Sequence, residues 1–232
     1  MNGIHYKSKM ENIPFEEFLR RTGFSLKNFG FYGLEEVKYI VAPTNLKKIL
    51  MVNAMPLDYL HGLLSKIGSL GNPENKIYAN AEIGLECIDP NILVVGQRFV
   101  YRKNYTAILE NFRNLFTGFA LPRGISKLTP FLIIGIDAAD RYVLAHYLPP
   151  IVEIHEDKLV LLDGVHRNFI ARQTGANQES IVIKGVKTPF PCTSKGWNEI
   201  RVVDEKPVNI EDRYFNLKKE LFRDLKGIGI DG

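Results

Sequence analysis

Cysteine is scarce in this sequence, and long apolar runs are missing. Only Cys87 and Cys192 occur in 232 residues, and they show no CxxC or Cys/His spacing, so we expect neither a zinc site nor a disulfide framework. No stretch approaches the roughly 18 to 20 apolar residues that a membrane span needs. The N-terminal residues also lack the apolar run of a secretory signal. We therefore expect a soluble cytoplasmic protein without a membrane partner.

A strong excess of one charge is missing as well. The chain has 30 Lys and Arg against 26 Asp and Glu, which gives a net charge of +4. Its densest basic cluster comprises only Arg98, Arg102 and Lys103, and this charge by itself identifies no polyanionic partner. What the chain does have is 45% hydrophobic residues over a length that can bury a full core. It therefore needs no disulfide or metal to fold.

The first third of the chain has mainly helical spacing of its apolar residues. Residues 14–23 and 56–68 each show this spacing between a proline and a glycine, which predicts two helices. Residues 46–52 predict a third helix, because a capping residue precedes them. We therefore expect a mainly helical N-terminal portion over residues 1–75.

From residue 76 onward the apolar pattern shortens, which predicts an α/β core over residues 76–232. A C-terminal segment at 198–232 is expected to dock on this core. The pattern predicts, in order, strands at 77–88 and 92–101, a helix at 105–116, a surface loop at 117–130 and a buried strand at 131–136.

The most informative pattern lies between residues 151 and 186. Two predicted strands at 151–154 and 159–162 are joined by a polar turn, and Asp163-Gly164 ends the second one abruptly. A helix is predicted at 165–174 and a third strand at 180–186. The order is therefore strand, Asp-Gly turn, helix, strand.

Residues 163–167 carry the chemistry of this segment. The first amides of a helix have no intrahelical acceptors, and the helix dipole places partial positive charge there. Gly164 permits close approach of the backbone, while Arg167 and His166 offer further donors. Asp163 could cap the helix, orient Arg167, or hold a divalent cation that bridges phosphates. Together these residues predict an anion site of the phosphate-binding kind.

One set of residues carries a family resemblance: 148–152, 161–167, Ala171, Gly175 and 181–183. Within residues 131–187 they resemble the core of the ParB/sulfiredoxin-like superfamily, whose hallmark is a DGxHR-type turn that opens a helix after a two-stranded element. The resemblance implies an α+β fold with a ParB/sulfiredoxin-like mixed-sheet core, to which the helical N-terminal portion is added.

The resemblance also implies a bound nucleotide. Chromosome-partition ParB proteins bind CTP, sulfiredoxin uses ATP, and free-serine kinases use ADP or ATP. Val165 stands where sulfiredoxin has its catalytic cysteine, which argues against sulfinic-acid reduction, and no helix-turn-helix module follows the core. The chain therefore looks nearer to the kinase-like members, with ATP or ADP as the expected ligand, CTP as the alternative, and Mg²⁺ beside it. The resemblance implies phosphate contacts from Gly164, His166 and Arg167, and Val165, Asn168 and, from the loop at 188–197, Lys195 complete the expected phosphate-binding residues.

The expected function is an ATP- or ADP-dependent phosphotransferase or a nucleotide hydrolase acting on a small molecule. Catalytic roles are expected for Asp163, His166 and Glu86, and the choice of base stays open among the carboxylates Glu82, Glu86, Asp137 and Asp140. No residue is assigned as a protein metal ligand. The alternatives are a ParB-like nucleic-acid-associated module, either DNA-binding or a nuclease, and a nucleotide switch without turnover.

Other chemistry-bearing residues have simpler interpretations. The aromatic residues Phe24, Phe29, Phe31 and Tyr32 could stack a base, but core or lid packing is favoured. His146 and His155 are interpreted as exposed or core-satisfied rather than catalytic. Cys192 is interpreted as an unreactive loop thiol.

Overall fold

The computed structural model describes residues 10–115 and 128–230, and for residues 111–115 it describes the backbone only. Contacts divide the chain into two compact units. The first comprises Met1–Asn80, Thr129–Leu148 and Arg223–Gly232, and the second comprises Ala81–Leu128 and Pro149–Phe222. Both units are built from segments distant in sequence, whereas the predicted division at residues 75 and 76 runs along the chain and stays a prediction.

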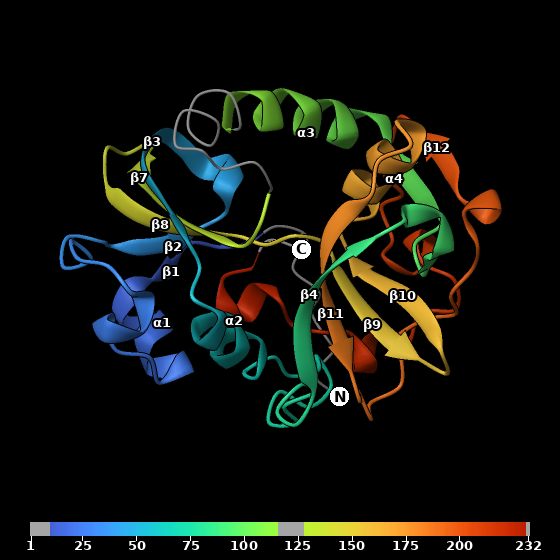
Figure 1. Cartoon of the computed structure of the whole chain (residues 1–232), viewed down its shortest axis with the longest axis horizontal. Helices are drawn as coiled ribbons and strands as arrows, with labels where there is room; N and C mark the ends of the chain where they lie inside the picture. The colour runs from blue at the N-terminus through green and yellow to red at the C-terminus, as the bar shows by residue number, and fades with distance from the viewer. Residues whose placement is uncertain (1–9, 116–127, 231–232) are drawn as a thin grey trace. The chain divides into compact units, whose positions relative to one another are not determined.

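A five-stranded sheet in the order β1-β2-β8-β7-β3 forms the first unit (Figure 1). The pairing of β2 with β8 is parallel, and the other pairings are antiparallel. The helices α1 and α2 confirm the two helices predicted around residues 14–23 and 56–68. The bounds are β1 Ile13–Pro14, α1 Phe15–Thr22, β2 Tyr39–Val41, β3 Leu46–Ala54, α2 Leu57–Leu64, β7 Phe131–Asp137 and β8 Tyr142–Tyr147.

The prediction of a helix at 46–52 is wrong. This stretch is the strand β3, which pairs along its whole length with β7 and carries two register shifts. A short run of apolar residues fits a strand or a helix equally well by periodicity, so the pairing partner decides. The nearly continuous apolar strand β7 supplies that partner. The strands β1, β2 and β3 therefore lie beside the helices of the N-terminal portion.

Aromatic packing makes much of the core of the first unit. The rings of Phe24 and Phe29 lie 4.7 and 4.9 Å from the ring of Tyr59, and Phe18 and Phe29 are fully buried. The interpretation of these phenylalanines as core residues is therefore confirmed. Tyr32 differs, because it is 94% exposed.

The second unit holds a mixed sheet in the order β4-β11-β9-β10-β5 and a separate parallel pair of β6 and β12 (Figure 1). Within the sheet, β9–β11 and β5–β10 are parallel, and β4–β11 and β9–β10 are antiparallel. The bounds are β4 Glu82–Ile88, β5 Val94–Val95, β6 Phe99–Tyr101, α3 Arg102–Leu115, β9 Ile151–His155, β10 Lys158–Asp163, α4 Val165–Gln173, β11 Gln178–Lys184 and β12 Arg201–Val203.

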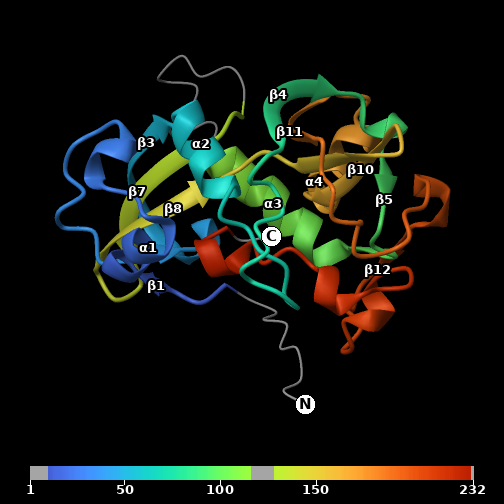
Figure 2. The same ribbon diagram turned by 90° about the horizontal axis from the view of Figure 1, so that it is seen from below.

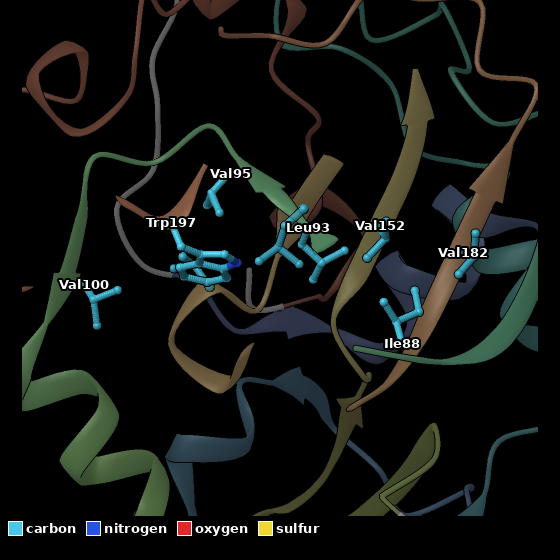
Figure 3. Packing of buried hydrophobic residues seen from close by; sticks show 9 residues of the cluster. Ile88, Leu93, Val95, Val100, Val152, Val182 and Trp197 are labelled. Carbon is cyan, nitrogen blue, oxygen red and sulfur yellow. The ribbon is translucent and has the colours of Figure 1, made fainter. Parts of the chain in front are cut away.

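The core of the second unit lies between its sheet and α4. Figure 3 shows Val152 and Val182 on neighbouring strands and the indole of Trp197 beside Val95. The Trp197 Nε1 donates to the Pro90 carbonyl at 2.7 Å, which satisfies its only polar group. The helix α4 contributes Val165 to this cluster. Apolar packing thus fixes the helix whose first turn carries the predicted chemistry.

The α+β class with mixed sheets is confirmed, and so is the strand–turn–helix–strand order of 151–186. Two details differ. The predicted strand at 92–101 is interrupted and forms β5 and β6. The strands β7 and β8 pair in the sheet of the first unit rather than with the strands that flank the turn. Of the helices in the described residues, none is both long and apolar enough to cross a membrane.

Candidate functional site

The turn between β10 and α4 depends on Gly164. Its backbone is left-handed, with φ 91° and ψ 25°, a region that residues with a Cβ adopt at a cost. A Cβ added there would also lie 2.8 Å from the Pro150 Cβ and 2.9 Å from the Pro150 Cγ. The close approach predicted for Gly164 is therefore made to Pro150, and any side chain at this position would displace the turn.

The first turn of α4 has no side-chain cap among the described residues. Gly164 is the N-cap residue, and its carbonyl accepts from the Asn168 amide at 2.9 Å. No acidic residue lies in the first turn to offset the helix dipole. The N-terminus of this nine-residue helix therefore keeps its donors and its partial positive charge.

Asp163 and Arg167 form a largely buried ion pair beside the turn. The Arg167 Nη2 donates to the Asp163 Oδ2 at 2.8 Å, and the two side chains are 13% and 16% exposed. Of the three roles considered for Asp163, the structure shows the orientation of Arg167, and capping is excluded because Gly164 is the N-cap. The pair therefore holds a guanidinium group next to the helix N-terminus.

Asn168 is completely buried one helical turn further on. Its Nδ2 donates back to the Gly164 carbonyl at 3.2 Å, and its Oδ1 has no hydrogen-bond partner among the described residues. A buried acceptor without a partner costs about 1–3 kcal/mol. This cost is borne by a side chain that fixes the first turn of α4 from inside the fold.

His166 is held as a neutral imidazole. Its Nε2 accepts from the Tyr101 amide at 3.0 Å, and burial, with smaller effects of Lys206 and Arg167, lowers its pKa to about 4. Because Nε2 is the acceptor, the proton of the neutral ring lies on Nδ1. His166 therefore offers a donor to a ligand and is poorly suited to act as a base.

Tyr101 joins the starts of two helices. It is the last residue of β6, α3 begins at the next residue, and its amide binds the second residue of α4. The two helices contact each other, as both Figure 1 and Figure 2 show. Two helix N-termini therefore lie close together, and their dipoles favour the same negative charge.

Two positively charged side chains from other segments lie near Tyr101. The Arg102 Nε donates to the Asp204 Oδ1 at 2.7 Å, and the Lys206 Nζ lies 5.5 Å from the centre of the Tyr101 ring. Sequence reasoning missed Tyr101 and Lys206, because each is distant in the chain from the turn and neither belongs to a local motif. The amide of Tyr101 binds His166, and the pairing of β6 with β12 brings the segment before Lys206 beside Tyr101.

A scan against protein-family models matches residues 60–201 to the ParB CE domain, which is more than half of the chain. The chain belongs to the ParB CE domain family. The match confirms the ParB/sulfiredoxin-like resemblance, while nearness to the kinase-like members stays a prediction. A search of curated proteins and a search of solved structures gave no match.

Two predicted site residues of this ParB CE domain lie away from the turn. Glu86 is on the edge strand β4, where it binds Lys184 at 2.9 Å, and β11 and β9 separate β4 from β10. Lys195 is exposed, and its backbone pairs with Val95 of β5, the strand next to β10. Lys195 therefore lies on the β5 side of the sheet and Glu86 on its opposite edge.

The carboxylates Asp137 and Asp140 belong to the hairpin between β7 and β8 in the first unit. Asp137 accepts from the Arg141 guanidinium at 2.6 Å and from the Ala139 and Arg141 amides. The hydrogen bond from Arg141 keeps the pKa of Asp137 low. Asp140 binds Lys47 at 2.8 Å. Both carboxylates of this ParB CE domain hold their hairpin, and neither belongs to the turn.

Possible metal ligands and His155 were the other groups of interest in the part of the chain that the structure describes. No group of three or more His, Cys, Asp or Glu there could hold a metal ion. His155 is part-buried and shares a 2.5 Å hydrogen bond with the buried Glu153. Its prediction as a core-satisfied residue therefore holds.

Proposed function

We propose that this ParB CE domain binds a nucleotide by its phosphates at the turn between β10 and α4. ATP and ADP are the first candidates, and CTP is the alternative. The observation that carries the proposal is the start of α4, where an N-terminus without a side-chain cap in the described residues lies beside the positioned guanidinium of Arg167. Backbone amides and arginine together are a complement to phosphate oxygens.

The donors at the turn suit an oxyanion in number and kind. The first amides of α4, the Arg167 guanidinium and the His166 Nδ1–H are all donors, and Arg167 is already fixed by Asp163. Hydrogen bonds to charged groups contribute about 1.5–3 kcal/mol each. Because Arg167 is held in place before the ligand arrives, little side-chain entropy is lost on binding.

Asn168 supports the turn from inside the fold. Its Nδ2 is engaged by the Gly164 carbonyl and its side chain is completely buried, so the amide does not supply the phosphate contact that the sequence suggested.

Phosphoryl transfer to a small molecule, or hydrolysis of the nucleotide, is the finer part of the proposal. His166 would contribute by donating to phosphate charge, because its neutral ring carries the proton on Nδ1. Glu86 has no support as the base, since it is bound to Lys184 at the far edge of the sheet. Asp163 is the carboxylate beside the turn.

Mg²⁺ fits this arrangement only together with the nucleotide. Magnesium bound with phosphates takes one or two protein carboxylates and keeps several waters. The described residues offer no three-ligand cluster, and Asp163 is the one carboxylate that the turn supplies. When bound, the ion would neutralise phosphate charge, and Asp163 would be the carboxylate to hold it.

The test is calorimetric titration of the whole chain with ATP, ADP and CTP, each with and without Mg²⁺. We expect binding of at least one nucleotide and a loss of at least thirtyfold in Arg167→Ala, which corresponds to about 2 kcal/mol. The matched control is Arg172→Ala on the same helix, whose side chain binds Asn91. Failure of every nucleotide to bind would remove the proposal, and full affinity in Arg167→Ala would remove the guanidinium clamp.

Turnover and the alternatives are separated by two further measurements. Release of phosphate or ADP during incubation supports the enzyme, whereas binding without release favours a nucleotide switch. A nucleic-acid-associated role predicts DNA affinity that falls steeply with salt. The basic residues gathered for that alternative are engaged within the fold, since Arg98 lies over the Phe215 ring and Arg102 binds Asp204.

A further inference from the structure

An open cavity in the first unit shares no residue with the proposed nucleotide site. Its volume is about 460 Å³, and sites for small molecules usually measure about 300–1,000 Å³. Three segments line it: Asn12 before β1, residues 44–47 around the start of β3, and residues 137–139 with Arg141 from the hairpin between β7 and β8. All of them belong to the first unit, so this unit by itself forms the cavity.

Arg141 lines the cavity with one side of its guanidinium group fixed. Its Nε and Nη2 donate to the Asp137 Oδ2 at 2.9 and 2.6 Å, and its Cζ lies 4.2 Å from the centre of the Tyr39 ring. A guanidinium group has five N–H donors, and Asp137 takes two of them. The other side, formed by Nη1 and the second hydrogen of Nη2, is a planar fork that matches a carboxylate.

Asp137 positions Arg141 and is itself fully used within the hairpin. Its Oδ1 accepts from the Ala139 and Arg141 amides at 2.9 and 3.0 Å, while its Oδ2 accepts from the guanidinium group. The residue is 4% exposed. The hydrogen bond to Asp137, with a smaller contribution from Tyr39, raises the pKa of Arg141. The guanidinium group is therefore held charged and in a fixed plane before any ligand binds.

Lys47 supplies a second positive charge from the edge strand β3. Leu46 pairs with Asp137 and Lys48 pairs with Ile136, so Lys47 is the extra residue at this register shift. An extra residue of this kind changes the direction of side chains along a strand. The Lys47 Nζ lies 2.8 Å from the Asp140 Oδ1, with side chains 57% and 75% exposed. An ion pair this exposed is weak, so a ligand can replace Asp140 at little cost.

We infer that this cavity binds a small organic acid, with its carboxylate on the free fork of Arg141 and Lys47 as the second positive charge. The lining includes these two cations, whereas its one carboxylate, Asp137, is used within the hairpin. The inference goes beyond the proposed nucleotide site, because it assigns a second ligand to a different part of the chain.

Neutral polar side chains on the wall favour an acid that also carries a hydroxyl group. Asn12, Thr44 and Asn45 line the cavity, and the Asn45 Nδ2 lies 3.4 Å from the Asn12 Oδ1. Amide and hydroxyl groups both donate and accept hydrogen bonds. A hydroxy acid can therefore use the charged and the neutral parts of the wall together.

The test is calorimetric titration of the whole chain with malate, a small hydroxy acid, and with its uncharged diamide. We expect malate to bind with a dissociation constant of about 1 mM or tighter, and the diamide to bind about tenfold more weakly or not at all. Inorganic phosphate, titrated in the same way, should bind more weakly than malate, because it cannot reach the neutral part of the wall.

Two variants and a matched control test the assigned residues. Arg141→Lys keeps a positive charge beside Asp137 but removes the planar fork, so malate affinity should fall about tenfold. Lys47→Ala should lower it about threefold, because an exposed charge acts through solvent. The control Lys48→Ala removes the next lysine of β3, which is exposed and outside the lining, and should change nothing. Thermal unfolding checks the fold of each variant, and the exposed Lys47 keeps the test open if Arg141→Lys is unstable.

The outcomes separate this inference from the proposed function. It is refuted if malate does not bind, if the diamide or phosphate binds at least as tightly, or if Arg141→Lys keeps full affinity. An equal loss in Lys47→Ala and Lys48→Ala also refutes it, since only the general field would then matter. Arg167→Ala should bind malate normally, and a loss there would place malate at the turn. Malate binding by a chain that binds no nucleotide supports the cavity and removes the proposed function alone.

Discussion

Two buried histidines, one in each unit, look alike by pKa and differ in their hydrogen bonds. Burial lowers the pKa of both His146 and His166 to about 4. His146 uses both ring nitrogens, because Nε2 lies 2.6 Å from the Tyr59 hydroxyl and Nδ1 lies 3.0 Å from the Gly229 carbonyl. Among the described residues, His166 makes a hydrogen bond only through Nε2.

The difference shows which of the two imidazoles has both ring nitrogens satisfied within the protein. His146 is 3% exposed and joins β8, α2 and the segment at Gly229, so its polar groups are satisfied within the first unit. His166 is partly exposed, lies among cations and keeps one donor for a ligand. A low pKa therefore does not distinguish the two histidines, whereas their hydrogen-bond partners do, and the proposed phosphate contact rests on the second difference.

The largest expected effect is a loss of stability when His146 is replaced. His146→Ala should lower the free energy of unfolding by about 4 kcal/mol, because it leaves a cavity beside Phe18 and a buried Tyr59 hydroxyl without its partner. Urea unfolding measures the loss. Nucleotide affinity of the folded variant should not change. A loss under 1 kcal/mol, or weaker nucleotide binding, would undo the contrast between the two histidines.

Lowering the pH should also reduce stability through His146, by a somewhat smaller amount than the substitution. The folded-state pKa of His146, about 4, lies below the ordinary 6.5, so the unfolded chain binds its proton first as the pH falls. Stability is therefore lost between pH 6.5 and about 4, by roughly 3 kcal/mol from this one group. His146→Gln cannot titrate, and its unfolding free energy should fall less over that range. Parallel curves for the two proteins would contradict the assignment.

The smallest expected effect is a loss of nucleotide affinity when His166 is replaced. His166→Phe keeps an aromatic ring beside Tyr101 and removes the Nδ1 donor, so nucleotide affinity should fall about fivefold, or about 1 kcal/mol. Calorimetric titration measures the change. Stability should fall by a similar small amount, because the Tyr101 amide loses its acceptor. Unchanged affinity would make His166 a structural residue like His146.

Local chemistry explains why the turn could be predicted from the sequence. The Asp-Gly pair ends a strand, Gly164 adopts the left-handed backbone without the cost of a Cβ, and the apolar residues after it have helical spacing. These signals lie within a few residues of one another. The Asp163–Arg167 pair is also local, since it joins the last residue of β10 to the first turn of α4 across the Gly164 turn.

Residues brought together by strand pairing could not be predicted in the same way. Nothing local indicates that β6 and β12 lie side by side, so Tyr101 and Lys206 were missed and Lys195 was chosen from a neighbouring loop. Glu86 was chosen because it lies on a predicted strand, but the order of the sheet puts two strands between it and β10. Strand order is a property of the whole fold.

His146 also bears on how long a fragment of this protein must be for grafting or independent expression. The family match ends at residue 201, the first residue of β12, and begins at residue 60, inside α2. A fragment with those limits would lack the Gly229 carbonyl that His146 needs and the lysine that follows β12. As a module for grafting or independent expression, the chain must therefore include residues on both sides of the region that defines its family.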